Sequence, residues 1–331
     1  MAKITVLGSG GWGAALAVMA QRFGHNVTLW SPFSEEIDEI REHGEHRRLL
    51  PGVAIPSSMT LTTDPACVAD ADLTLMVTPS FALEQTAERI RPYFKDGGIL
   101  AIATKGLEET GCQRFSQIIE NTLPAARVAV LSGPSHAEEV GRGVPTSVVA
   151  ASRDLATAKA VQDILMNPVF RIYITEDVIS VELGGALKNV IALSAGICDG
   201  LQMGDNTKAA LMTRGLAEMM RLGAAAGGNE HTFSGLSGMG DLIVTCSSMH
   251  SRNRRAGILI GQGVPPAEAI KSVGTVEGYL AVKTAVRLAA QYGVEMPITE
   301  ACYRVCYEGA SPRAAIAELM DRPKKHENEL P

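Results

Sequence analysis

The sequence predicts an α/β protein, with an N-terminal doubly wound Rossmann-type sheet followed by an all-helical C-terminal domain. A glycine-rich turn joins the first strand pattern to a helix pattern, and short β-branched runs then alternate with helix-length segments. Strand patterns almost vanish after about residue 177. A chain of 331 residues can bury two cores. We therefore expect a dinucleotide-binding domain over residues 1–177 and a helical substrate-binding domain over residues 178–331.

Hydrophobic periodicity places the elements of the first half. Runs rich in β-branched and aliphatic residues predict strands at Ile4–Leu7, Val27–Trp30, Leu73–Val77, Ile99–Ala103, Val128–Leu131, Ser147–Ala150 and Arg171–Ile174. Apolar residues at helical spacing predict helices at Trp12–Phe23, Phe81–Tyr93 and Ala156–Leu165. This alternation is typical of a parallel sheet with helices on both faces.

Long patterns rich in Ala, Leu and Met fill the second half. They predict helices at Val178–Ile197, Thr207–Ala226, Arg254–Gly261, Gly278–Tyr292 and Ile298–Tyr307. A glycine-rich interruption at Ser234–Asp241 separates them into two groups. The last segment, Asp321–Pro331, mixes charges with proline, so we expect it to fray.

Composition argues against several classes of function. With 30 Lys and Arg against 36 Asp and Glu, the formal charge of −6 gives no general attraction to nucleic acid or acidic membranes. The six cysteines have neither a zinc-pair spacing nor the density of a disulfide scaffold, which favours reduced thiols in the cytoplasm and no metal site. We expect no secretion signal, because the sequence enters a strand pattern at Lys3–Leu7. We also expect no membrane span, because apolar stretches such as Val190–Ala195 are much shorter than the roughly 20 residues needed.

The glycine-rich turn has the spacing of a dinucleotide-binding fingerprint. In GSGGWG, Gly8, Gly10 and Gly13 follow the first predicted strand and open a helix. The first glycine permits the tight turn, the second lets the backbone approach a pyrophosphate, and the third lets the helix lie close to the strand. The helix N-terminus then offers N–H groups and a positive dipole to the pyrophosphate. Glycine clusters are often only turns, but this position between strand and helix favours a dinucleotide.

The end of the second predicted strand bears on the choice of coenzyme. An NAD site usually has Asp or Glu there to bind the ribose 2′-OH, whereas this chain has Trp30, Ser31 and Pro32. Since no carboxylate there repels a 2′-phosphate, and Arg47 and Arg48 lie in a following loop, we prefer NADPH, with NADH as the alternative. The alternative is that both arginines are solvated surface charges with no role in binding the coenzyme.

Polar residues also follow two later strands, at the sheet edge where doubly wound proteins bind ligands. Lys105 follows one predicted strand, and Gly133 and Ser135 follow the next. These residues are candidates for holding a substrate. For Lys105 the alternative is a solvated lysine at a strand end.

Polar residues interrupt the apolar helix that opens the second domain. Gly184 and Lys188 lie one turn apart on one helix face, as do Gly185 and Asn189. Each helical glycine costs roughly 1 kcal/mol relative to alanine, so we expect a close approach there. A lysine amine shielded from water can both donate and accept a proton. Asp241, at the end of the glycine-rich interruption, is a second candidate, with simple helix capping as its alternative.

The segment His250–Arg255 is the densest cationic cluster in this acidic chain. Arg252 can bind a phosphate with two parallel hydrogen bonds, and Ser251 and Asn253 can donate beside it. A solvated helix start is the alternative, and it suits Arg254 and the arginine after it better than Arg252.

Taken together, these motifs resemble the bacterial NAD(P)-dependent glycerol-3-phosphate dehydrogenase family over nearly the whole chain. The matching segments, in order, are GSGGWG, ATKGLE at Ala103–Glu108, SGPSHAEEV at Ser132–Val140, GGALKNVIAL at Gly184–Leu193, SGMGDLIVTC at Ser237–Cys246, HSRNRR at His250–Arg255 and TVEGY at Thr275–Tyr279. Several ungapped motifs in one order are far more specific than a glycine fingerprint alone.

The resemblance implies reversible reduction of dihydroxyacetone phosphate to sn-glycerol 3-phosphate, feeding phospholipid synthesis, in a homodimer. By motif position, Lys188 is implied as proton donor and acceptor, while Lys105, Asp241 and Thr245 lie at the reacting oxygen. The implied substrate contacts are Lys105, Gly133, Ser135, Lys188, Asp241, Ser251, Arg252 and Asn253. The coenzyme contacts, from the fingerprint and the resemblance together, are Gly8, Ser9, Gly10, Trp12, Gly13, Arg48, Lys105, Ala137, Arg252, Val276 and Glu277.

Two departures from the family pattern and two rival functions accompany this interpretation. The family often has Arg or His near positions 32 and 33, where this chain has Pro32 and Phe33, and His136 stands where bacterial members commonly carry Phe. A 3-hydroxyacid or 6-phosphogluconate type dehydrogenase would also use a Lys and Asn pair, but on a carboxylate substrate. A non-catalytic dinucleotide sensor is the other alternative. The cluster around Arg252 favours a phosphate monoester.

Overall fold

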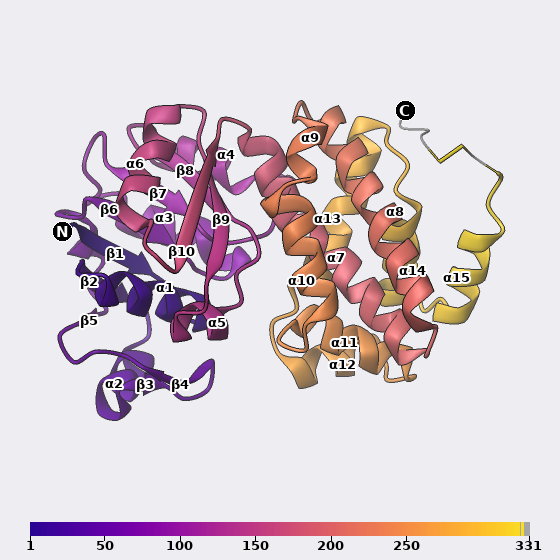
Figure 1. Ribbon diagram of the computed structural model, residues 1–331, viewed down its shortest axis with the longest axis horizontal. Helices are drawn as coiled ribbons and strands as arrows, with labels where there is room; N and C mark the ends of the chain where they lie inside the picture. The colour runs from indigo at the N-terminus through magenta and orange to yellow at the C-terminus, as the bar shows by residue number, and fades with distance from the viewer. Residues whose placement is uncertain (325, 328–331) are drawn as a thin grey trace. The chain divides into compact units, whose positions relative to one another are not determined.

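The structure, a computed structural model, describes residues 1–324, 326 and 327, and it forms two compact units (Figure 1). Unit 1 comprises Met1–Lys105 and Phe115–Val178, and unit 2 comprises Gly106–Arg114 and the described residues from Ile179 onward. The predicted single division at residue 177 does not include the crossing of residues 106–114 into unit 2. Burial explains that crossing, because Leu107 and Cys112 pack into the apolar core of unit 2.

Unit 1 is built on an eight-stranded sheet with the order β10-β9-β8-β7-β6-β1-β2-β5, beside a small β3-β4 hairpin. The strands are β1 (Lys3–Leu7), β2 (Asn26–Trp30), β3 (Glu45–His46), β4 (Leu50–Ala54), β5 (Thr60–Thr62), β6 (Leu73–Met76), β7 (Ile99–Ile102), β8 (Arg127–Ser132), β9 (Thr146–Ala151) and β10 (Phe170–Thr175). The Rossmann-type prediction is confirmed, but β3, β4 and β5 were not predicted.

The sheet departs from the predicted parallel arrangement at one pair of strands. Strand β9 runs antiparallel to β8, with Ser132 opposite Val149, whereas β10 is parallel to β9. The chain after β8 turns back from the same end of the sheet through a short helix, so no crossover carries it to the opposite end. The sheet is therefore mixed, and its other neighbouring strands pair in parallel.

Helices and 3₁₀ turns link these strands. They are α1 (Gly11–Arg22), α2 (Ser34–His43), η1 (Pro65–Val68), η2 (Ser80–Ala82), α3 (Leu83–Ile90), α4 (Phe115–Thr122), α5 (Ala137–Arg142) and α6 (Leu155–Leu165). Helix α1 is buried from Gly13 to Ala20 and packs into the main apolar core of the unit with Val161 and Leu165 of α6. Helix α2 was not predicted. It buries only Ile37 and Ile40 among charged residues, so its apolar periodicity is weak in the sequence.

Unit 2 is helical, as predicted, apart from a π-helical turn. Its elements are α7 (Val178–Gly200), α8 (Gly204–Ala225), α9 (Glu230–Phe233), the π turn η3 (Leu236–Gly240), α10 (Asp241–Ser247), α11 (Arg252–Gly261), α12 (Pro266–Val273), α13 (Glu277–Tyr292), α14 (Pro297–Tyr307) and α15 (Pro312–Met320). The prediction for Asp321–Pro331 concerns a segment of which residues 325 and 328–331 lie outside the described part of the chain.

Helix α7 is long and apolar enough to cross a membrane, but 94% of its most apolar window is buried inside the structure. The stretch Val190–Ala195, from which no membrane span was predicted, is one uninterrupted apolar run within this longer helix. Its burial is that of a core helix, which other elements of the protein cover.

The order of strands reverses at the centre of the unit 1 sheet. The chain passes from β1 outward to β2 on one side, and from β6 outward to β7 and β8 on the other. In open sheets of this kind, the carboxyl ends of the strands beside such a reversal form the ligand-binding edge. The glycine-rich turn directly follows β1 and therefore lies at this edge.

Candidate active site

The glycine-rich turn between β1 and α1 fits a pyrophosphate. Gly8 has a φ of +117°, and a Cβ there would lie 2.8 Å from the carbonyl oxygen of Val77. A Cβ at Gly13 would lie 1.9 Å from the Gly8 oxygen, so only glycine allows this approach. At Gly10 an added Cβ would meet no atom within 4 Å. Gly10 is also the N-cap of α1, and no side chain caps the N–H groups of the first turn of that helix.

A carboxylate that was not among the predicted site residues lies beside this turn. Glu36, in the first turn of α2, accepts a 2.6 Å hydrogen bond from Ser9 and a 2.8 Å hydrogen bond from Ser31, both through Oε2. Ser9 belongs to the glycine-rich turn and Ser31 directly follows β2. The acidic first turn of the helix after the second strand was the signal in the sequence. The predicted coenzyme contact Trp12 has a buried indole N–H with no acceptor among the described residues.

The arginines proposed to reach a 2′-phosphate lie in and beside the β3-β4 hairpin. Arg47 is 3.8 Å from Glu45, and Arg48 is exposed. Burial is the main reason that the pKa of the nearby His46 falls below its ordinary value, and the charge of Arg48 lowers it further, while Glu36 opposes both. Arg48 therefore lies close enough to His46 to be felt electrostatically. It has no hydrogen bond or ion pair within the described residues.

The residues that follow β7 and β8 come together, as the order of the strands requires. The Lys105 amine donates a 2.8 Å hydrogen bond to the Gly133 carbonyl and a 3.2 Å hydrogen bond to Ser135 Oγ. Gly133 has a φ of +136°, and a Cβ there would lie 3.0 Å from the Cα of Val148. Lys105 is thus held by two oxygens at the binding edge, and is not a lysine that only water surrounds.

Lys188 of α7 is held inside unit 2 by a carboxylate and a hydroxyl. Its amine lies 2.7 Å from Asp241 Oδ1 and 2.8 Å from Thr245 Oγ1. Thr245 in turn donates a 2.6 Å hydrogen bond to the backbone oxygen of Asp241, one turn earlier in α10. All three residues are buried, and the Lys188 side chain keeps 8% of its exposure. The structure therefore unites three predicted catalytic residues at one point.

Gly184 makes this approach of α10 to α7 sterically possible. A Cβ on Gly184 would lie 2.6 Å from the carbonyl oxygen of Ser237, in the π turn that precedes Asp241. A close approach at this glycine was expected from the sequence. The approaching segment is the π turn of the same unit, which delivers Asp241 to the lysine.

The predicted phosphate cluster begins α11. Ser251 is the N-cap, and its Oγ accepts the N–H of Arg254. The Asn253 side chain is buried, donates to Asn189 Oδ1 of α7 at 2.9 Å and accepts the Gly278 N–H of α13 at 2.8 Å. Arg252 is exposed at the first position of the helix.

The side-chain amide of Asn253 is therefore occupied in joining three helices. Arg254 is paired with Asp199 at 2.7 Å, which gives that arginine a partner within the protein. Arg252 is exposed at the start of this ten-residue helix, and an arginine side chain beside a helix N-terminus is suited to an anion.

The remaining predicted contacts lie at helix starts. Ala137 begins α5 in unit 1, directly after His136. Val276 is the buried residue before α13 in unit 2, and Glu277 is the first residue of that helix. Each of these positions adjoins backbone N–H groups at a helix N-terminus.

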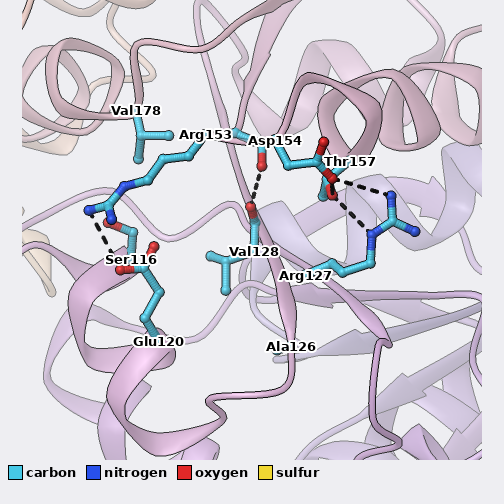
Figure 2. A pocket seen from close by; sticks show the side chains of 10 residues that line it. Ser116, Glu120, Ala126, Arg127, Val128, Arg153, Asp154, Thr157 and Val178 are labelled. Atoms are coloured by element: carbon cyan, nitrogen blue, oxygen red, sulfur yellow. Dashed lines mark hydrogen bonds and ion pairs between the residues drawn. The ribbon is translucent and has the colours of Figure 1, made fainter.

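A separate hollow of about 230 Å³ in unit 1 contains none of the predicted residues (Figure 2). Its lining includes Arg127 and Arg153, which lie 3.7 Å from Asp154 and 3.6 Å from Glu120. Because each arginine faces a carboxylate, the hollow offers an anion little net positive charge.

The fold and these residue clusters define a class of protein. A dinucleotide fingerprint lies at the reversal of strand order in a Rossmann-type sheet, and a buried lysine is held by a carboxylate in a helical unit. This combination is that of a nicotinamide-dependent dehydrogenase, in which a proton must accompany each hydride.

Comparisons with known proteins narrow the class. Residues 3–158 match the family model described as NAD-dependent glycerol-3-phosphate dehydrogenase N-terminus, and residues 177–317 match the corresponding C-terminus. A relative from Desulfitobacterium hafniense, glycerol-3-phosphate dehydrogenase (NAD(P)+), is 52% identical over 99% of this chain and 94% of its own length.

Solved structures agree with these matches. The crystal structure of glycerol-3-phosphate dehydrogenase from Coxiella burnetii has a TM-score of 0.93 and 38% identity, and the alignment covers 97% of this chain and 99% of that one. A D-mandelate dehydrogenase, at 17% identity and a TM-score of 0.63, shares the fold alone. The chain belongs to the NAD-dependent glycerol-3-phosphate dehydrogenase family.

Proposed function

We propose that this chain catalyses the reversible reduction of dihydroxyacetone phosphate to sn-glycerol 3-phosphate with NAD(P)H, supplying glycerophospholipid synthesis. The observation that carries the proposal is the cluster of Lys188, Asp241 and Thr245, within a chain of this family. The exposed Arg252 at a helix N-terminus supports a phosphate monoester as substrate over a carboxylate.

The chemistry requires a proton donor beside a ketone oxygen. A bound dihydronicotinamide supplies the hydride to the ketone carbon, and the oxygen of that carbon gains negative charge. Lys188 donates a proton from Nζ to this oxygen, and it accepts a proton from the alcohol in the reverse direction. Asp241 and Thr245 hold the amine in one orientation, so it is positioned before the reaction begins.

Three further groups are assigned to binding and polarisation. Lys105, held by Gly133 and Ser135, contributes a positive charge at the ligand-binding edge of the unit 1 sheet. Arg252 binds the phosphate, with the α11 N-terminus beside it. A phosphate held away from the reacting carbon supplies binding energy that orients the ketone, so part of the affinity for the substrate lowers the reaction barrier.

The test is a steady-state assay with dihydroxyacetone phosphate and each of NADH and NADPH, followed by absorbance of the reduced nicotinamide. Lys188→Ala should keep its coenzyme affinity and lose most of its turnover. Lys159→Ala, which removes an exposed lysine paired with Asp163, is the matched control and should keep full turnover. Near-normal turnover of a folded Lys188→Ala variant would rule out the proton-transfer role.

The reverse assay, with NAD+ or NADP+ and an alcohol substrate, separates the rival functions. Faster oxidation of a 3-hydroxyacid or of 6-phosphogluconate than of sn-glycerol 3-phosphate would reject the substrate assignment. Coenzyme binding without hydride transfer to or from any of these substrates would favour a dinucleotide sensor.

We also propose that the enzyme is a homodimer and works in the cytoplasm. The family resemblance supports the dimer, and the six cysteines, all free thiols, agree with a reducing compartment. Light scattering coupled to size-exclusion chromatography measures the mass directly, and a mass of one 35.0 kDa chain would contradict the dimer.

A further inference from the structure

The position after β2 bears a built carboxylate site. Glu36 reaches back from α2 to contact the glycine-rich turn through Ser9 and the end of β2 through Ser31. Both serines are almost fully buried, at 2% and 1% exposure, so neither contact is a chance arrangement of surface side chains. Glu36 itself is half-buried.

Backbone contacts hold these three residues in register. The Gly8 N–H donates to the Trp30 carbonyl at 2.9 Å, which fixes the turn against the end of β2. Ser31 Oγ accepts the Phe33 N–H at 3.3 Å while its hydroxyl donates to Glu36. The carboxylate therefore belongs to the same rigid edge as the glycine-rich turn.

The second oxygen of this carboxylate can accept a hydrogen bond from a hydroxyl group. Within the described residues both hydrogen bonds fall on Oε2, so Oε1 can accept further bonds. In a dinucleotide fold, an acidic group beside the end of the second strand meets the hydroxyls of the adenosine ribose. The absence of a carboxylate from residues 30–32 was the ground for preferring NADPH, and Glu36 supplies one from the next helix.

A 2′-phosphate bound at Glu36 would meet the negative charge of that carboxylate directly. Glu36 and Glu39 of α2 both act on His46, which burial holds below its ordinary pKa and which therefore adds no full positive charge near neutral pH. The nearby cations offset this charge only in part. Arg47 lies 3.8 Å from Glu45, and Arg89 lies over the Trp30 ring. Arg48 is exposed, so water screens its attraction for a phosphate.

We propose that Glu36 binds the 2′- and 3′-hydroxyls of the adenosine ribose and makes this chain select NADH over NADPH. This preference for NADH depends on the proposed function only in assuming that a nicotinamide dinucleotide binds. It is a property of binding, so it can be measured without turnover. A carboxylate and a dianionic phosphate in contact give discrimination of at least about tenfold, even with strong solvent screening.

Titration calorimetry on the full chain tests the proposal without catalysis. The probes are NADH, NADPH and the nicotinamide-free fragments ADP-ribose and 2′-phospho-ADP-ribose. The wild type should bind each unphosphorylated member of these pairs at least about tenfold more tightly. Glu36→Gln, which keeps the shape and removes the charge, should reduce both ratios about tenfold, mainly by improving binding of the phosphorylated members.

Glu42→Gln is the matched control, because it removes an exposed charge near the far end of the same helix, and it should leave both ratios unchanged. Equal affinities of the wild type for NADH and NADPH, or unchanged ratios in a Glu36→Gln variant with wild-type circular dichroism, would overturn the proposal. Selective NADH binding by a chain that reduces no triose phosphate would uphold Glu36 and remove only the proposed function.

Discussion

Separating Lys188 from Asp241 provides a quantitative test of the buried cluster. The two charges lie 2.7 Å apart, with side-chain exposures of 8% and 1%. Lys188→Met keeps most of the side-chain volume but leaves the carboxylate buried without its cation, which costs about 3–5 kcal/mol. Thr245 also loses its contact with the amine, a smaller loss of about 1 kcal/mol.

The double variant Lys188→Met with Asp241→Leu removes both charges together. Replacing a buried pair by apolar groups is often close to neutral, so this variant should be more stable than Lys188→Met alone. We expect a coupling free energy of about 3 kcal/mol between the two positions.

Equilibrium unfolding in urea, followed by far-UV circular dichroism, measures the four free energies of the cycle. The helical signal reports chiefly on unit 2, where both residues lie. If the two single losses add to within about 0.5 kcal/mol of the double loss, the residues are energetically independent. The proposed positioning of the amine by Asp241 would then have no energetic basis.

Three further predictions concern other parts of the chain. Gly10→Ala should weaken coenzyme binding about tenfold in calorimetry yet leave the free energy of unfolding unchanged, because its Cβ meets no protein atom. Gly13→Ala should lose about 3 kcal/mol of the free energy of unfolding or fail to fold, because its Cβ lies 1.9 Å from a backbone oxygen. Arg252→Ala should raise the KM for dihydroxyacetone phosphate about tenfold or more, whereas Arg255→Ala, which removes a nearby exposed arginine, should not. Equal KM values for the two variants would contradict the role of Arg252 in binding the phosphate. Burial raises the pKa of Glu218 from 4.5 to about 7, so the folded chain holds this proton more tightly than the unfolded chain, and the resulting stability is fully present below pH 4.5 and lost as the pH rises through about 7. Glu218→Gln should flatten that part of the dependence of Tm on pH, and an unchanged slope would show that the carboxyl is already ionised.

Much of the fold was accessible from periodicity, because the relevant patterns are local. The long strands of unit 1 and the helices α7, α8 and α13 carry strong apolar patterns, and the structure has them close to the predicted bounds. The short strands β3 to β5 and the charged helix α2 bury few side chains, so their sequences hardly differ from those of loops. The antiparallel direction of β9 depends on where a connection returns, which periodicity does not record.

The sequence by itself determined the dinucleotide turn and the identities of the polar residues inserted into apolar segments. Glycine spacing is a local requirement of backbone geometry, and a lysine within an apolar helix is visible without knowledge of its partners. Only the tertiary structure decided which residues meet. Asp241 and Thr245 contact Lys188 although more than fifty positions of chain separate them from it. Asn253 joins two helices through Asn189, and Glu36 contacts the turn that follows β1. The physical reason is that hydrogen bonds and ion pairs act over a few ångströms in space, and packing between elements sets those distances.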